Sequence, residues 1–132
     1  MRKLAFTIIL VLIILYAVPF PVYGLFSFAF GLEPPEGVSP LLFIFSVLIM
    51  KLGTAIGFVL IFYIARRSLS GQWFLYAFLW WIMFVLVECG MALGPNYGWM
   101  EAIAGVISET IYFPLAALIT ERLIGIKRQG LD

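Results

Sequence analysis

Four long apolar stretches, separated by short polar segments, are the feature that most restricts the fold of this chain. They cover residues 4–24, 41–65, 73–93 and 99–124. A helix needs roughly 20 mostly apolar residues to cross a bilayer. The chain is also 64% apolar and only 11% charged, whereas soluble domains are about half apolar and about a quarter charged. The pattern predicts an all-α polytopic membrane protein, with four transmembrane helices bundled in one domain.

The connections between these stretches are short. Residues 25–40 form an interfacial and outer loop, in which the sequence EPPEGVSP is rich in turn formers and has no periodic apolar pattern. We expect an inner loop at residues 66–72, an outer turn at residues 94–98 and a cytoplasmic tail at residues 125–132.

The first stretch allows two interpretations. It follows Arg2 and Lys3, and a basic start before an apolar run is also typical of a cleaved signal peptide. No A-x-A site follows, and apolar sequence continues to Leu32, which favours a retained helix. Pro19 and Pro21 remove backbone donors and clash with the preceding turn, so a kink or a helix end is expected there.

Positive charge is distributed unevenly and predicts an orientation. Lysines and arginines that flank membrane spans stay on the cytoplasmic side, most reliably in short loops. One side of a four-span arrangement carries Arg2, Lys3, Arg66, Arg67, Arg122, Lys127 and Arg128. The loops on the other side have no lysine or arginine and carry Glu33, Glu36 and Glu101. We therefore expect both termini in the cytoplasm and a multi-pass protein of the plasma or inner membrane.

Lys51, Glu88 and Glu109 are the charged residues that lie well inside the predicted spans, away from the helix ends. A charge near the bilayer centre costs at least about 2.5 to 3.5 kcal/mol on insertion scales, so each must be compensated. At about 1.5 Å per residue, Lys51 and Glu109 lie roughly 15 Å from the outer ends of their helices, and Glu88 roughly 8 Å. Equal depth makes Lys51 and Glu109 the best candidate ion pair. One carboxylate then lacks a cationic partner, which makes the group a candidate proton-binding site.

The fourth helix is predicted to turn a stripe of polar and small residues inward. Its members recur at spacings of three and four residues, and small residues let a neighbouring helix approach closely. They are Ala102, Gly105, Glu109, Tyr112 and Ala116. Pro114 deprives the carbonyl of Thr110 of its helical donor, so a kink is expected. Ser46 of the second helix and Gly105 should lie close to the level of Glu88.

The second helix carries two further features. Thr54 shares the face of Lys51, whereas Gly53 and Gly57 project away from that face. The two glycines form a GxxxG motif, which is typical of helix association within a chain or between copies of it.

Aromatic residues fall at predicted helix ends. Trp73, Tyr97 and Trp99 stand where amphipathic rings favour the headgroup region of a membrane. We interpret them as interfacial anchors.

The available residue types exclude several kinds of chemistry. One cysteine, Cys89, and the lack of histidine rule out an internal disulfide, a Cys/His zinc site and bis-histidine haem ligation. Mechanisms that use a Ser-His pair are excluded as well. The only aspartate, Asp132, lies in the tail, which excludes a two-aspartate membrane protease. We expect no metal and no cofactor, and we rank catalysis below the other functions.

Two functions remain open. In the first, the protein is an accessory, assembly or structural membrane subunit whose buried charges meet complementary groups in the chain or on a larger partner. In the second, it is a small proton- or cation-coupled transporter or channel that acts as a homo-oligomer, because four short helices enclose little space. The length and four-span plan resemble small multidrug transporters, but that family's glutamate in the first helix has no counterpart here. The expected surroundings are the lipid bilayer, with no nucleic acid.

Overall fold

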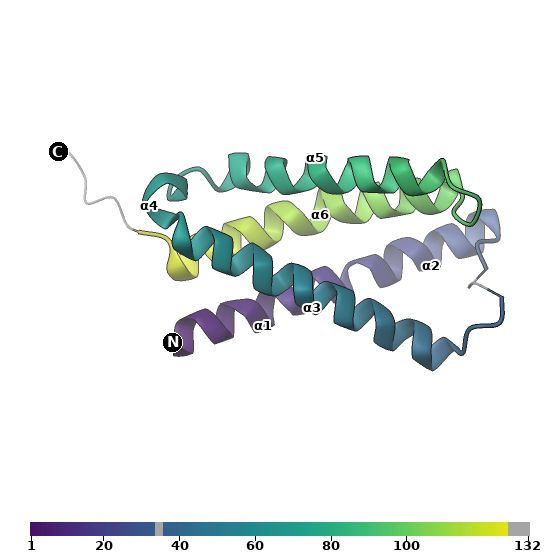
Figure 1. Ribbon diagram of the computed structural model, residues 1–132, viewed down its shortest axis with the longest axis horizontal. Coiled ribbons are helices and arrows are strands. Elements are labelled where there is room, and N and C mark those ends of the chain that lie inside the picture. Colours follow the sequence, from purple (N-terminus) through teal and green to yellow (C-terminus); the bar gives the residue numbers. More distant parts are fainter. Residues whose placement is uncertain (34–35, 127–132) are drawn as a thin grey trace.

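The computed structural model describes residues 1–33 and 36–126, so the expected tail residues Lys127 and Arg128 lie outside the described part. The described part contains helices and loops, which confirms the all-α prediction (Figure 1). Its helices are α1 (Arg2–Ala17), α2 (Pro19–Phe30), α3 (Pro40–Ile64), α4 (Arg66–Leu69), α5 (Trp73–Ala92) and α6 (Trp99–Ile124).

Four helical segments are long and apolar enough to cross a membrane. They are the joined α1 and α2 (Arg2–Phe30), α3, α5 and α6. In the most apolar window of the first three segments, only 17%, 17% and 11% of the residues are buried inside the protein, against 50% in α6. The first three segments therefore turn apolar side chains outward, and α6 lies at the centre.

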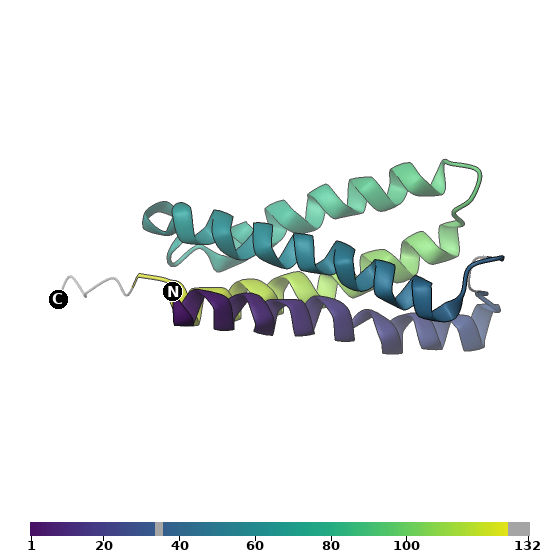
Figure 2. The ribbon, with the colours of Figure 1, turned by 60° about the horizontal axis from the view of Figure 1, so that its bottom comes forward.

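The first span is almost continuous (Figure 2). Val18, between α1 and α2, keeps helical dihedral angles of φ −61° and ψ −41°. Pro19 and Pro21 therefore interrupt the hydrogen-bond ladder without ending the helix. The helix instead ends at Gly31, whose φ of 66° is in the left-handed region that favours glycine. The segment that we expected to form an interfacial loop from residue 25 onward is thus helical up to Phe30.

α6 organises the bundle. It packs against α1, α2 and α5, and α3 packs mainly against α1. All five residues of the predicted inward stripe are buried, together with the neighbouring Ser108, Phe113, Ala117 and Thr120. The helix continues through Pro114. The small residues allow the close approach of neighbouring helices that the sequence predicted.

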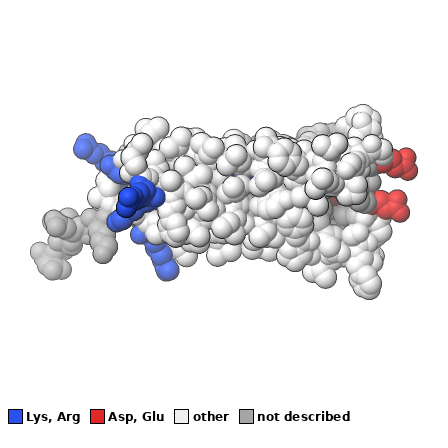
Figure 3. Space-filling model, turned by 90° about the horizontal axis from the view of Figure 1, so that it is seen from below, with Lys and Arg blue, Asp and Glu red and all other residues white. Residues whose placement is uncertain are grey.

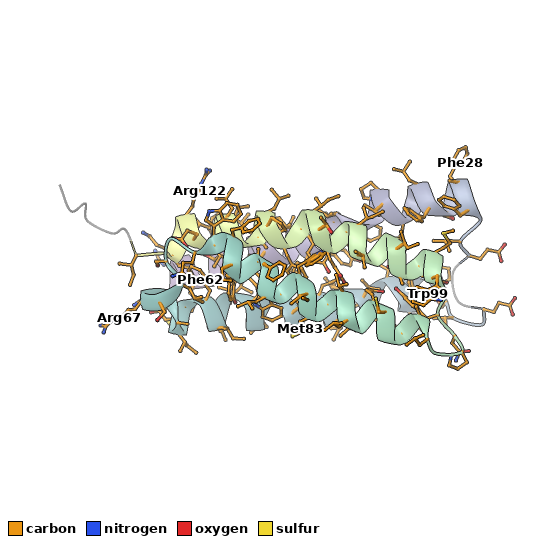
Figure 4. The ribbon with its side chains drawn as sticks, turned by 90° about the horizontal axis from the view of Figure 1, so that it is seen from above. Phe28, Phe62, Arg67, Met83, Trp99 and Arg122 are labelled. Carbon is orange, nitrogen blue, oxygen red and sulfur yellow. The ribbon has the colours of Figure 1, made fainter. Side chains whose placement is uncertain are left out.

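The two ends of the described part differ in charge, with lysine and arginine side chains projecting at one end and glutamates at the other (Figure 3). We call the first the basic end, and its described members are Arg2, Lys3, Arg66, Arg67 and Arg122. We call the second the acidic end, with Glu33, Glu36 and Glu101. Figure 4 shows Arg67 and Arg122 at the basic end, whereas Phe28 and Trp99 lie toward the acidic end.

An aromatic core joins α3, α5 and α6 in the half of the bundle nearer the basic end. The ring of Phe58 lies 4.7 Å from that of Tyr76, 5.3 Å from that of Trp80 and 5.9 Å from that of Phe113, measured between centroids. The hydroxyl of Tyr76 also donates to the carbonyl of Phe58. These contacts hold α3 and α5 together, and the two helices diverge toward the acidic end (Figure 1, Figure 2).

Candidate functional site

Six polar side chains gather between the middle of the bundle and the acidic end. They come from α2, α3, α5, the α5–α6 turn and α6. They interact with one another through hydrogen bonds and through the electrostatic effects of nearby charges. We call them the polar cluster: Tyr23, Lys51, Glu88, Tyr97, Glu109 and Tyr112. The structure therefore brings together the three charged residues that the sequence singled out.

Lys51 is held by Tyr112. Its Nζ donates to the Tyr112 hydroxyl at 3.0 Å and lies 4.7 Å from the centroid of the phenol ring. The structure has this hydrogen bond in place of the direct ion pair expected between Lys51 and Glu109. Glu109 remains close enough to attract the ammonium electrostatically. The reason is that α3 and α6 make few contacts. Tyr112, one turn after Glu109, has the longer side chain and therefore reaches Lys51 across the gap.

Glu88 rests directly on α6 at Gly105. A Cβ atom at position 105 would lie 2.5 Å from the carboxylate carbon of Glu88, closer than carbon atoms can approach. Only glycine therefore leaves room for the carboxylate in its present position. This contact confirms the prediction that Glu88 and Gly105 lie at a similar depth in the bundle.

Two tyrosines connect Glu88 to the acidic end. The Tyr97 hydroxyl donates to Glu88 Oε2 at 2.6 Å and lies 3.4 Å from the Tyr23 hydroxyl. Since Tyr97 gives its one hydrogen to Glu88, Tyr23 is the donor to Tyr97, and it shares its single hydrogen between that hydroxyl and the carbonyl of Glu101 at 3.3 Å. Burial raises the pKa of Tyr97, and the hydrogen bond to Glu88 raises it further by a smaller amount. Tyr97 therefore stays protonated at neutral pH and remains a donor.

Glu109 is the most deeply buried charged residue in the described part of the chain. Its side chain is 2% exposed, and its Oε2 atom has no hydrogen-bond partner among the described residues. Lys51 and Glu88 both lie close enough to interact with it electrostatically. An unpaired carboxylate oxygen in an apolar interior is costly, so Glu109 is the member of the cluster that most needs a further partner.

The polar cluster is closed toward the basic end. There the interior of the bundle is filled by the fully buried side chains of Leu15, Phe58, Phe113, Ala116 and Ala117. The hydrogen bonds of the polar cluster extend instead toward the α5–α6 turn. Hydrogen bonds therefore link the polar cluster to the acidic end, and the aromatic core separates it from the basic end.

The other predicted supporting residues lie outside the polar cluster. Ser46 is exposed and Thr54 half-buried, and each hydroxyl donates to a carbonyl of its own helix. A Cβ atom at Gly53 would meet nothing within 4 Å, and one at Gly57 would touch only Trp80, at 3.9 Å. The GxxxG motif is therefore not used for close helix packing within the described chain.

Sequence reasoning missed two members of the cluster. The sequence predicts that Tyr97 is an interfacial anchor, yet its hydroxyl donates to Glu88. The short α5–α6 turn was the available signal, because it returns residue 97 to the last turns of α5, where Glu88 lies. Tyr23 lies in an aromatic stretch without any comparable signal.

Changing Gly105 to alanine should displace the Glu88 carboxylate and break its bond with Tyr97. We expect Gly105→Ala to lower the free energy of unfolding in detergent by about 1 kcal/mol, the typical contribution of a polar contact in a membrane protein. Gly90→Ala on α5 is the matched control, because a Cβ atom there meets nothing within 4 Å. In a Glu88→Ala background the cost of Gly105→Ala should disappear. Equal stability of the two alanine variants would contradict the assigned contact.

Comparison with known proteins gives no relative from which an activity could be transferred. No protein-family model, curated protein or solved structure matches this chain. What the chain can do is therefore argued from the polar cluster, in which a lysine and two glutamates are only partly compensated by three tyrosines.

Proposed function

We propose that this chain is a four-span integral membrane protein, with both termini in the cytoplasm, that serves as an accessory or assembly subunit of a larger membrane complex. One observation carries the proposal. Lys51, at the middle of α3, and Glu88, on α5, are only partly buried by the chain itself. They lie on the two helices that diverge toward the acidic end (Figure 1).

The energetics of charge in a membrane support a partner at this place. Lys51 has three N–H donors, and its hydrogen bond within the described chain goes to Tyr112, a neutral group. Ionisable side chains at this depth face a bundle interior or a water-filled cavity, or they pair with other polar groups. A transmembrane helix that offers a carboxylate or an amide at mid-depth would complete the shell around Lys51.

Assembly is therefore expected to depend on the charged residues of the cluster. Lys51→Met, Glu88→Gln and Glu109→Gln should each reduce recovery of a co-purifying partner, or the abundance of the protein, by about fivefold for a lost contact of about 1 kcal/mol. The measurement is cross-linking in native membranes, then purification in mild detergent and mass spectrometry. Glu36→Gln, in an exposed loop, is the control and should change neither. Unaltered assembly and abundance in all three variants would rule out the accessory function.

A second candidate function rests on a separate observation, the buried and unpaired Oε2 of Glu109. A proton or a small cation would satisfy this atom, and the tyrosines between Glu88 and the acidic end provide polar groups along the approach. The aromatic core closes the opposite side, so release there would require a conformational change. This arrangement supports a proton- or cation-coupled transporter that acts as a homo-oligomer.

The transporter candidate makes a different prediction for Glu109. Glu109→Gln keeps the shape of the side chain but removes its ability to bind and release a proton. In reconstituted vesicles, we expect this variant to lose proton- or cation-driven flux while it keeps wild-type helical content and elution volume. The control is Glu101→Gln at the start of α6, because glutamine keeps an oxygen that can accept the backbone N–H of Gly98, as Glu101 does. Normal flux in Glu109→Gln would exclude transport through this site.

The proposed orientation can be tested with single cysteines in a Cys89→Ser background. Glu36 and Ser68 are both exposed and lie in opposite connections, at the acidic and basic ends respectively. In intact cells, a membrane-impermeant maleimide should label Glu36→Cys, because the acidic end faces outward by the distribution of lysine and arginine. It should label Ser68→Cys only after permeabilisation. The reverse pattern would place the basic end outside.

A further inference from the structure

A pocket at the basic end lies far along the bundle from the polar cluster and plays no part in the proposed function. It has a volume of about 290 Å³ and forms where the ends of α1, α3, α4 and α6 meet. Its polar lining comes from Lys3, Tyr63 and Arg66, and its apolar lining includes Leu4 and Leu123. Cationic and aliphatic groups therefore line the same partly open pocket at one end of the candidate membrane spans.

The cations of the pocket are suited to a phosphate group. The guanidinium of Arg66 lies over the ring of Tyr63, 4.2 Å from its centroid, and such stacking orients the planar head of arginine. Its N–H groups form a fork that matches two phosphate oxygens, and an ammonium such as that of Lys3 adds a point charge.

The surroundings of the pocket reinforce its preference for an anion. Arg2, Arg67 and Arg122 add positive charge at the same end. Glu121 is the carboxylate at this end in the described chain, and its Oε1 already accepts the backbone N–H of Gly71 at 2.8 Å. Its buried Oε2 has no hydrogen-bond partner among the described residues, and Glu121 does not line the pocket.

The position and the walls of the pocket distinguish a lipid from a soluble anion. Leu4 and Leu123 present carbon rather than hydrogen-bonding groups. The same end of α1 and α3 also exposes large apolar side chains, with Phe6 54% and Ile64 81% exposed. A ligand that places a phosphate against the cations and hydrocarbon against this surface matches both parts. Basic pockets between helix ends are sites where anionic lipid headgroups bind.

We propose that this pocket binds one anionic phospholipid, with its phosphate held by Arg66 and Lys3 and the upper part of its acyl chains against Leu4 and Leu123. The phosphodiester accepts the N–H groups of the guanidinium and the ammonium. The site is independent of the polar cluster, so its failure would leave the proposed function untouched.

The test is native mass spectrometry of the purified full chain, titrated with phosphatidylglycerol or phosphatidylcholine in mixed micelles. The double variant Lys3→Gln/Arg66→Gln should bind phosphatidylglycerol at least about tenfold more weakly than the wild type, as expected when two basic contacts are lost. The control Arg2→Gln/Arg67→Gln removes the same charge from the same end but spares the lining of the pocket. Equal weakening in both double variants would show a general charge effect and would overturn the proposal.

Two further measurements are needed. One distinguishes binding in the pocket from a general effect of charge, and the other distinguishes binding of a lipid from binding of free phosphate. Leu123→Trp should fill the apolar part and reduce retention of phosphatidylglycerol without any change in charge. Inorganic phosphate at equal concentration should fail to displace the lipid. Unchanged retention in Leu123→Trp, or displacement by inorganic phosphate, would overturn lipid binding at this site. Circular dichroism of each variant verifies that the helices are intact.

Discussion

The packing of the other helices around one face of α6 is the constraint on which the rest of the structure depends. In lipid there is little hydrophobic force between helices, so association relies on close packing and polar contacts. The buried face of α6 provides both, because Gly105 admits the Glu88 side chain and Tyr112 binds Lys51 across the bundle. The helix with the smallest side chains is thus also the one on which the charged residues converge.

This arrangement divides the bundle into two halves with different chemistry. Near the basic end, the rings of Phe58, Tyr76 and Phe113 hold α3 and α5 against α6. Toward the acidic end α3 and α5 diverge, and Lys51 and Glu88 are left partly exposed. Both candidate functions arise from this asymmetry. A partner helix would cover the exposed charges, and an ion would satisfy the inner carboxylate of Glu109.

How much of the site could be predicted depends on the kind of information each contact requires. Burial of Glu109 and its neighbours follows from spacing along one helix, and so could be predicted. That Glu88 and Gly105 lie at the same depth in the bundle follows from counting residues along their two helices. The partner of Lys51 could not be predicted in this way, because depth does not say how far apart two helices lie or which side chain is long enough to bridge them. Tyr97 was missed because a residue at a helix end can face either the headgroups or the bundle.

The sequence by itself determined the helical class, the four candidate spans and the separation of charge between the two ends. Each of these depends on the order of apolar and charged residues along the chain, and each needs only local spacing to be recognised. Only the tertiary structure decided that Pro19 and Pro21 leave the first helix nearly continuous, that Gly53 and Gly57 remain open, and that Lys51 bonds to Tyr112 instead of Glu109. The surroundings of the two glycines and the partner of Lys51 depend on the distances and rotations between helices, which in an apolar environment are set by side-chain shape rather than by hydrophobicity.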